Sequence, residues 1–295
     1  RHKCPLHSTR PLNDFALHRP LVTMSEFELE KKKQDKRDRK EFKETLVAVG
    51  KEDEPLVGRL MATGSNPDAV EDAKHPSGVK GIQDGWSALL LALLRKNLII
   101  ARELLAAGAT VDMVMGEGRF TALMYAAGYN MLDAVRLLFE YNANPNVVNK
   151  IGVTALHYAA LQGHVAMTRL LVDHGAALNM QDVDGATALL TAAHEGKIEV
   201  VRFLLDADAA IDLEDKKGRT PAKCVLLCKH VPTLELLLRY GANAHLAVVL
   251  PKIREVRTED EKNHAGAIVA ALKEQPSVVH LLADHSGTSL TKLLD

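Results

Sequence analysis

Cysteine and histidine are the side chains whose spacing in this sequence suggests chemistry. Cys224, Cys228 and His230 form a C-x3-C-x-H arrangement. Residues four apart share one face of a helix, and two thiolates with an imidazole can hold a zinc ion. His245 is the nearby candidate for a fourth ligand, but it does not stand at a zinc-site spacing. The alternative, that both cysteines are small apolar core residues, is favoured. The sequence therefore predicts no metal and no cofactor.

The 13 histidines of the chain raise the question of general acid–base catalysis. The sequence shows no Ser-His-Asp grouping, no glycine-rich phosphate loop and no H-E-x-x-H pattern. It therefore predicts a protein that is not an enzyme.

The charge balance and the cysteine count exclude several classes of partner. The 37 basic and 38 acidic side chains give a formal charge of −1, without the basic excess that nucleic-acid binding requires. Three cysteines are too few for a disulfide framework and indicate a reducing compartment. No apolar run approaches the roughly 18 residues of a membrane span. We expect a cytoplasmic protein, with a mitochondrial or nuclear location left open, that is monomeric on its own and binds neither nucleic acid nor membrane.

The elements that would position these side chains follow from an internal repeat. A Thr or Ser recurs at a nearly constant spacing, and a Gly-Ala pair or its remnant follows each one at a fixed distance. The first set is Ser87, Thr121, Thr154, Thr187 and Thr220, and the second is Gly108-Ala109, Asn142-Ala143, Gly175-Ala176, Asp208-Ala209 and Gly241-Ala242. The chain therefore contains five consecutive copies of one unit.

The copy at residues 152–179 indicates how each unit folds. Thr154 precedes an apolar run and suits an N-cap, which stabilises a helix by roughly 1 kcal/mol. Leu156 and Ala159 lie on one helical face, and Gly163 ends the helix where a positive φ is cheap. A second short helix follows. One such unit cannot bury its own apolar face, so neighbouring units must stack.

The constant period, which is close to the ~33 residues typical of ankyrin repeats, and the Thr-Ala-Leu-His and Gly-Ala signatures resemble that family. The resemblance implies an all-α solenoid of about six to seven helix-turn-helix units with short β-turn fingers. It also implies structural roles for His157, which bonds the Thr hydroxyl, and His164, which lies in the Gly-His turn. The function that it implies is a non-catalytic scaffold or adaptor that binds a protein partner.

The chain divides into five predicted segments. Residues 1–25 are expected to be a disordered basic tail, a reading favoured over part of a mitochondrial transit segment. A charged lead-in helix follows at 26–40, then a degenerate first repeat with an inserted loop at 41–83. Residues 84–244 hold five ankyrin repeats, and 245–295 a divergent C-terminal repeat and cap.

Two copies depart from the pattern. With the degenerate repeat counted as the first, the third repeat carries one extra residue between Gly118 and Thr121, which should distort its finger. In the sixth, larger residues from Lys223 to Lys229 replace the His and the Ala-Ala pair. We expect the stack to splay there.

By the same resemblance, partners dock on the concave side formed by the fingers and the first helices. The candidate positions are the residue before each Thr or Ser and the two residues after each Ala-Ala pair. The predicted partner-binding residues are Trp86, Arg95, Phe120, Tyr129, Leu161, Gln162, His194, Glu195 and Arg219. Trp, Tyr and Arg commonly carry interface energy. Trp86 is either an exposed anchor or a staple packed on the inserted loop, and the sequence does not decide between these roles.

Two other functions stay open. The chain could be a permanent structural subunit of a large assembly, held through its insertions at 71–83 and 245–263 and its basic helix at 31–43. It could also be the targeting part of an enzyme whose catalytic region lies outside this sequence.

Overall fold

The computed structural model describes residues 24–70, 85–228 and 230–242. The chain divides into two compact units, residues 1–40 and residues 41–295, which we describe separately. The predicted tail up to residue 23, the inserted loop at 71–83 and the predicted C-terminal repeat at 245–295 lie outside the described residues.

The described residues form α-helices, without an extended strand among them. The helices are α1 (Met24–Gly50), α2 (Glu54–Ala62), α3 (Ala88–Leu94), α4 (Leu98–Ala106), α5 (Ala122–Gly128), α6 (Leu132–Glu140), α7 (Ala155–Gln162), α8 (Val165–Asp173), α9 (Ala188–His194), α10 (Ile198–Asp206), α11 (Pro221–Cys228) and α12 (Val231–Arg239). They follow one another as pairs in which every helix after α1 is short, which confirms the predicted all-α repeat solenoid.

Helix α1 contains both the predicted lead-in segment and the predicted first helix of the first repeat. In the first unit it is a polar helix with exposed side chains, where Lys33 Nζ lies 2.8 Å from Glu30 Oε1 one turn away. In the second unit its last turns bury Leu46 and Val49. The change from a solvated helix to a packed one follows from this change in residue type.

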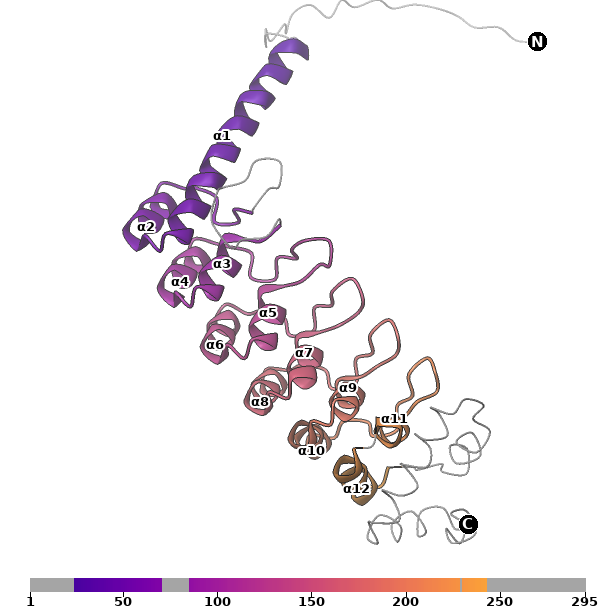
Figure 1. The fold of residues 1–295 in the computed structure, drawn as a ribbon. Helices are drawn as coiled ribbons and strands as arrows, with labels where there is room; N and C mark the ends of the chain where they lie inside the picture. Colours follow the sequence, from indigo (N-terminus) through magenta and orange to yellow (C-terminus); the bar gives the residue numbers. More distant parts are fainter. Residues whose placement is uncertain (1–23, 71–84, 229, 243–295) are drawn as a thin grey trace, which may run out of the picture. The chain divides into compact units, whose positions relative to one another are not determined.

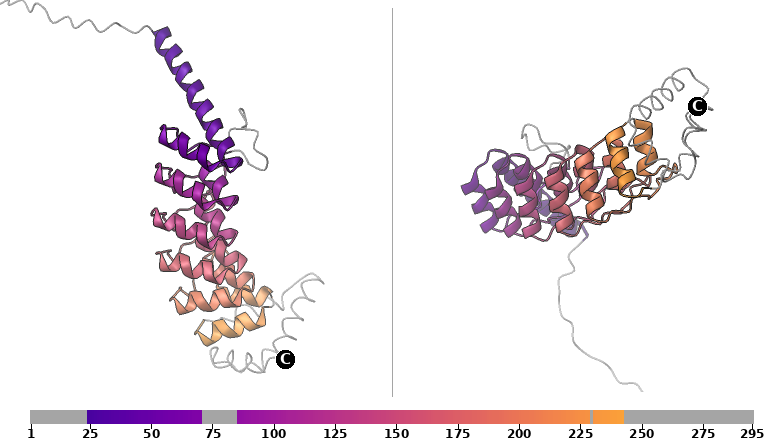
Figure 2. Two further views of the ribbon diagram at one scale, coloured as in Figure 1. Left: turned by 90° about the vertical axis from the view of Figure 1, so that its left-hand side faces the viewer. Right: turned by 90° about the horizontal axis from the view of Figure 1, so that it is seen from below.

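In the second unit, the first helices of successive pairs (α3, α5, α7, α9, α11) form one row and the second helices form another (Figures 1 and 2). From α5 to α11, neighbouring first helices pack more extensively on each other than neighbouring second helices do. In α5, α7 and α9 a small Ala-Ala pair, such as the fully buried Ala159 and Ala160 of α7, allows close approach.

The expected splaying of the sixth repeat is wrong. Val225 and Leu226 stand where α5, α7 and α9 have Ala-Ala, and both are buried. Helix α11 packs on α9 about as extensively as α9 packs on α7. The larger side chains are thus taken up between the helices rather than forcing them apart.

His157 anchors the N-terminus of α7, and the other four copies have no histidine at the equivalent position. His157 Nε2 lies 3.1 Å from the carbonyl oxygen of Ala186 in the next finger, so this nitrogen donates. His157 Nδ1 therefore accepts, and it lies 2.8 Å from Thr154 Oγ1 and 3.3 Å from Thr154 N. Burial lowers the pKa of His157, which keeps the ring neutral. The predicted structural role of this histidine is confirmed.

The fingers between the pairs are bonded to one another. The N–H of Lys150 donates to the carbonyl of Gly118, that of Val183 to Ile151, and that of Lys216 to Asp184, at 2.8–3.0 Å. Each of these three N–H groups belongs to one finger and its acceptor to the finger before it. The backbone therefore links successive repeats directly, in addition to the helix packing.

The finger of the third repeat differs from the others, as its extra residue predicts. Met115 and Phe120 exchange two backbone hydrogen bonds, of 2.7 and 3.0 Å, around a four-residue tip. In the fourth repeat, Asn149 N donates to Val153 O around a three-residue tip. The wider finger places Phe120 in a paired position immediately before α5.

Candidate functional site

The predicted partner-binding residues lie at two ends of the first helices. Trp86, Phe120 and Arg219 each precede the N-cap, on the finger side. The other six lie at or just beyond the C-terminal end of a first helix: Arg95, Tyr129, Leu161, Gln162, His194 and Glu195. A seven-residue helix is about 10 Å long, so the structure does not bring the predicted residues into one cluster.

On the finger side, four aromatic rings form a continuous row, which we call the aromatic row: Trp86, Phe120, Tyr125 and Tyr158. The ring centroids of Trp86 and Tyr125 are 5.7 Å apart, those of Phe120 and Tyr125 5.4 Å, and those of Phe120 and Tyr158 5.9 Å. All four side chains are half-buried against the core. Trp86 is thus held by a ring of the next repeat, and the inserted loop lies outside the described residues.

Two members of this row, Tyr125 and Tyr158, were absent from the sequence prediction. Both are the fourth residue after the N-cap of their helix. The sequence contained a signal for both tyrosines. The fourth position after the N-cap lies three and four residues before the positions already considered at the C-terminal end of each first helix, so it shares their helical face. The hydroxyl oxygen of Tyr158 accepts a hydrogen bond of 3.0 Å from Asn149 Nδ2, and burial raises the pKa of Tyr158.

At the other end of α5, Tyr129 is the most exposed large apolar side chain of the described residues, at 68%. It lines a groove of about 410 Å³ together with Lys96, Leu98 and residues 130–134. This groove lies between the α3–α4 turn and the α5–α6 turn. An exposed aromatic ring beside a groove is a candidate binding position.

Arg219 is held in place by its own finger. Its Nη2 lies 2.6 Å and its Nε 2.7 Å from Oδ2 of the buried Asp215. Burial alone would raise the pKa of Asp215, but the backbone and side-chain hydrogen bonds from Arg219 hold that pKa below its usual value. The guanidinium therefore stabilises the finger, and its charge is already paired.

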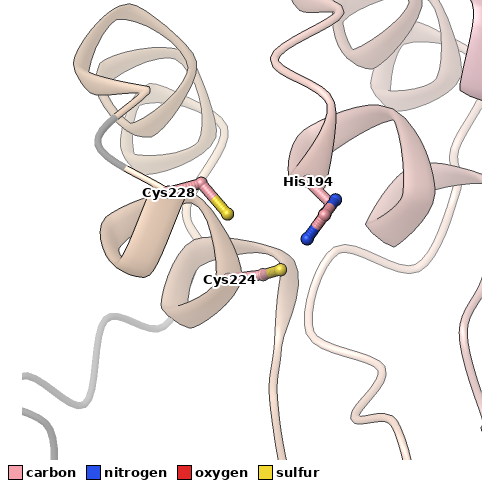
Figure 3. Close-up of side chains that lie close together, drawn as sticks. All are labelled: His194, Cys224 and Cys228. Atoms are coloured by element: carbon pink, nitrogen blue, oxygen red, sulfur yellow. The ribbon is translucent and has the colours of Figure 1, made fainter.

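The structure brings Cys224 and Cys228 together with His194 rather than with His230. One ligand atom from each of the three lies within 4.8 Å of the others, and Figure 3 shows one ring nitrogen of His194 directed toward the two sulfurs. His230 Nε2 instead lies 3.1 Å from the carbonyl oxygen of His194. The C-x3-C-x-H arrangement that was considered and set aside in the sequence thus shares its two cysteines with this cluster, but not its histidine.

The two cysteines differ in environment. Cys224 is 1% exposed, whereas Cys228 is half-buried. Burial, and then the neighbouring Cys228, raise the pKa of Cys224 to about 11, against the opposing effect of Arg219. Without a bound cation this thiol is therefore protonated at neutral pH.

Comparison with known proteins identifies the repeats. Residues 46–149 and 141–215 match the family described as ankyrin repeats (3 copies), and together these ranges cover more than half of the chain. The chain belongs to the ankyrin repeat family. A segment of 107 residues is 32% identical to a putative ankyrin repeat-containing protein of Treponema pallidum (strain Nichols). That match covers 36% of this chain and 32% of the relative, so the chain spans about a third of the relative's length.

Ankyrin repeats generally mediate protein–protein interaction. In this ankyrin repeat protein, two members of the aromatic row and one cysteine occupy equivalent positions of different repeats. Cys224 is the fourth residue after Thr220, as Tyr125 and Tyr158 are after their own N-caps. We call the fourth, seventh and eighth residues after each N-cap the first-helix stripe. Among the described helices, none combines the length and the apolar character needed to cross a bilayer.

Proposed function

We propose that this ankyrin repeat protein is a non-catalytic adaptor or scaffold that binds a protein partner along its first helices and fingers. The observation that carries the proposal is the aromatic row, whose rings are half-buried and continuous over three repeats. Large aromatic side chains that are already ordered lose little conformational entropy when a partner covers them.

Exposed apolar side chains on the fingers and at the other end of α5 extend the candidate surface along the first helices. Tyr129 is 68% exposed at the end of α5, and Ile151 and Val183 are 52% and 47% exposed on the fingers. A segment with apolar side chains would remove these groups from water, at roughly 25 cal/mol for each Å² of apolar area. The partner is therefore a protein that presents apolar anchors rather than a highly charged segment.

A photo-crosslinking residue placed at position 129 tests the proposal. It is expected to capture a discrete partner from extracts of the source cells, because Tyr129 lies beside the groove. The matched control is the same residue at position 99, since Ile99 is 59% exposed but lies on the second helix α4. Equal capture of the same protein from both positions would contradict binding along the first helices.

The purified partner then allows an affinity measurement. Tyr129→Ala is expected to weaken binding more than tenfold, as truncation of an aromatic hot spot does. It should change the free energy of unfolding by less than about 0.5 kcal/mol, as is usual for surface substitutions. Ile99→Ala should change neither quantity. Unchanged affinity in Tyr129→Ala would show that the partner does not contact the C-terminal ends of the first helices.

A further inference from the structure

The inference concerns the thiol end of the first-helix stripe, defined as His194, Cys224 and Cys228. We propose that these three side chains bind a single Zn²⁺ ion, with a water molecule as the fourth ligand. The proposal is independent of which protein the aromatic row binds. It rests on four features of the described residues: the ligand geometry, the packing of the two helices, the orientation of the imidazole and the charge of the filled site.

The ligand geometry is already close to that of a metal site. The two sulfurs and one imidazole nitrogen lie within 4.8 Å of one another. In a tetrahedral zinc site with Zn–S near 2.3 Å and Zn–N near 2.0 Å, ligand atoms lie roughly 3.5–3.8 Å apart. Small side-chain rotations would therefore bring the three atoms to bonding distance. Two thiolates and one imidazole form a ligand set that favours zinc over magnesium or calcium.

The helices that carry the ligands, α9 and α11, are packed against each other. Cys224 and Cys228 are one turn apart on α11, and His194 is the last residue of α9. Helix α9 is fixed by the fully buried Ala192 and Ala193, and α11 by Val225. A metal ion would thus find its ligands pre-positioned by two neighbouring repeats, and it would join those repeats.

The orientation of His194 matches the arrangement in known metal sites. Its Nδ1 lies 2.9 Å from Oε1 of Glu195. Ligating histidines generally donate their second ring N–H to a carboxylate or carbonyl group, which fixes the tautomer and the ring. With Nδ1 bonded to Glu195, Nε2 is the nitrogen left for the ion. His230 is already used, because it contacts the backbone of His194.

The charge of the filled site suits its partial burial. Zn²⁺ with two thiolates and a neutral imidazole carries no net charge, so burial at the 1% exposed Cys224 carries little desolvation penalty. Binding replaces two thiol protons, which pass to the solvent. The half-buried Cys228 and the half-exposed His194 leave a route for the ion and for the water ligand.

The first test is titration of the reduced, purified full chain with Co²⁺, a spectroscopic stand-in for Zn²⁺. We expect sulfur-to-cobalt charge-transfer bands and the visible bands of tetrahedral cobalt, saturating at one ion per chain and abolished by added Zn²⁺. A chain without the thiolate bands at stoichiometric Co²⁺ would overturn the proposal. So would binding of Cu⁺ without binding of Co²⁺ or Zn²⁺.

Matched variants assign the ligands. Cys228→Ser and His194→Ala are expected to lose the cobalt spectrum, whereas Cys4→Ser and His230→Gln are expected to keep it. Glu195→Gln should keep the spectrum and weaken the affinity roughly tenfold, because this carboxylate orients a ligand without touching the ion. A spectrum that survives Cys228→Ser, or one lost in His230→Gln and kept in His194→Ala, would contradict the assignment.

A measurement on the unaltered chain covers the case in which a variant fails to fold. Zn²⁺ is expected to slow alkylation of Cys228 at least tenfold, because a metal-bound thiolate is shielded from the reagent. Cys4 of the same chain is the internal reference and should react at an unchanged rate. Equal slowing at both cysteines, or slowing at neither, would overturn the site.

Discussion

The two ends of the first-helix stripe use the same scaffold for different chemistry. At the aromatic end, Tyr125 and Tyr158 take the fourth position after the N-cap and pack with Phe120. At the thiol end, the same position is Cys224, which lies with Cys228 and His194. Helix packing and capping differ little between the two ends. The repeat thus fixes where a side chain stands, while residue type alone decides whether the position suits an apolar partner or a metal ion.

The largest expected effect is that Zn²⁺ stabilises the thiol end and leaves the aromatic end unchanged. At free Zn²⁺ about 1,000 times the dissociation constant, binding should stabilise the native state by about 4 kcal/mol. Amide hydrogen exchange should slow in α9 and α11 and stay unchanged in α3 and α5, because repeat arrays couple mainly between neighbours. Removal of the metal with EDTA serves as the control. Uniform protection over all repeats would show that the two ends are not independent.

The next effect belongs to the aromatic end. Phe120→Ala should lower the free energy of unfolding by about 2 kcal/mol, less than a fully buried Phe because this ring is half-buried. A double-mutant cycle with Tyr158→Ala should give a coupling of about 1 kcal/mol. Denaturant unfolding measures both values. The cobalt affinity should stay unchanged in Phe120→Ala. A lower affinity would show that the aromatic end and the thiol end are not independent.

Alkaline pH should lower the free energy of unfolding of the metal-free chain by on the order of 2 kcal/mol, through Cys224 at the thiol end. The pKa of Cys224 is raised from an ordinary value near 9 to about 11, by burial and by Cys228, with Arg219 opposing. The folded state therefore holds its proton where the unfolded state has lost it. This contribution is complete below about pH 9 and is lost as the pH rises through about 11.

Urea unfolding of the metal-free chain across this pH range measures the loss. Cys224→Ala should reduce it, and the remaining decline should begin only above about pH 10, where the half-buried Tyr158 hydroxyl contributes in the same direction. An identical decline in Cys224→Ala and the unaltered chain would contradict the assignment to this thiol.

The smallest effect should be equal at both ends. Thr121 Oγ1 accepts from Met124 N at 3.3 Å, and Thr187 Oγ1 accepts from Leu190 N at 3.2 Å. Thr121→Ala and Thr187→Ala should therefore each cost about 1 kcal/mol in the metal-free chain. Denaturant unfolding of the two variants checks this. Costs that differ by more than about 1 kcal/mol would mean that the scaffold, not only its side chains, differs between the ends.

Much of the fold could be predicted because the repeat carries redundant local signals. Thr154 as N-cap, His157 as its partner and Gly163 with a positive φ each follow from position in the period. Residue size was a weaker guide. Val225 and Leu226 predicted a splayed stack, yet they are buried between packed helices, because contacts with neighbouring elements decide how much volume a position accepts.

The candidate sites were harder to predict, because they join residues of different repeats. His230 follows Cys228 closely in sequence, but it is the N-cap of α12 and lies beyond the end of α11. His194 belongs to the repeat before that of Cys224, yet the packing of α9 on α11 brings it to the sulfurs. A comparison of equivalent helix positions across repeats would have found this histidine, and it would also have found Tyr125.

The hydrogen bonds between fingers have a consequence for how the chain meets proteases. Lys150 and Lys216 are exposed trypsin sites at finger tips, but their amide groups are bonded to the preceding repeat. A protease needs an extended, released backbone, so cleavage at either lysine requires two adjacent fingers to separate first. The rate of cleavage after these two lysines should therefore measure how often one repeat separates from the repeat before it.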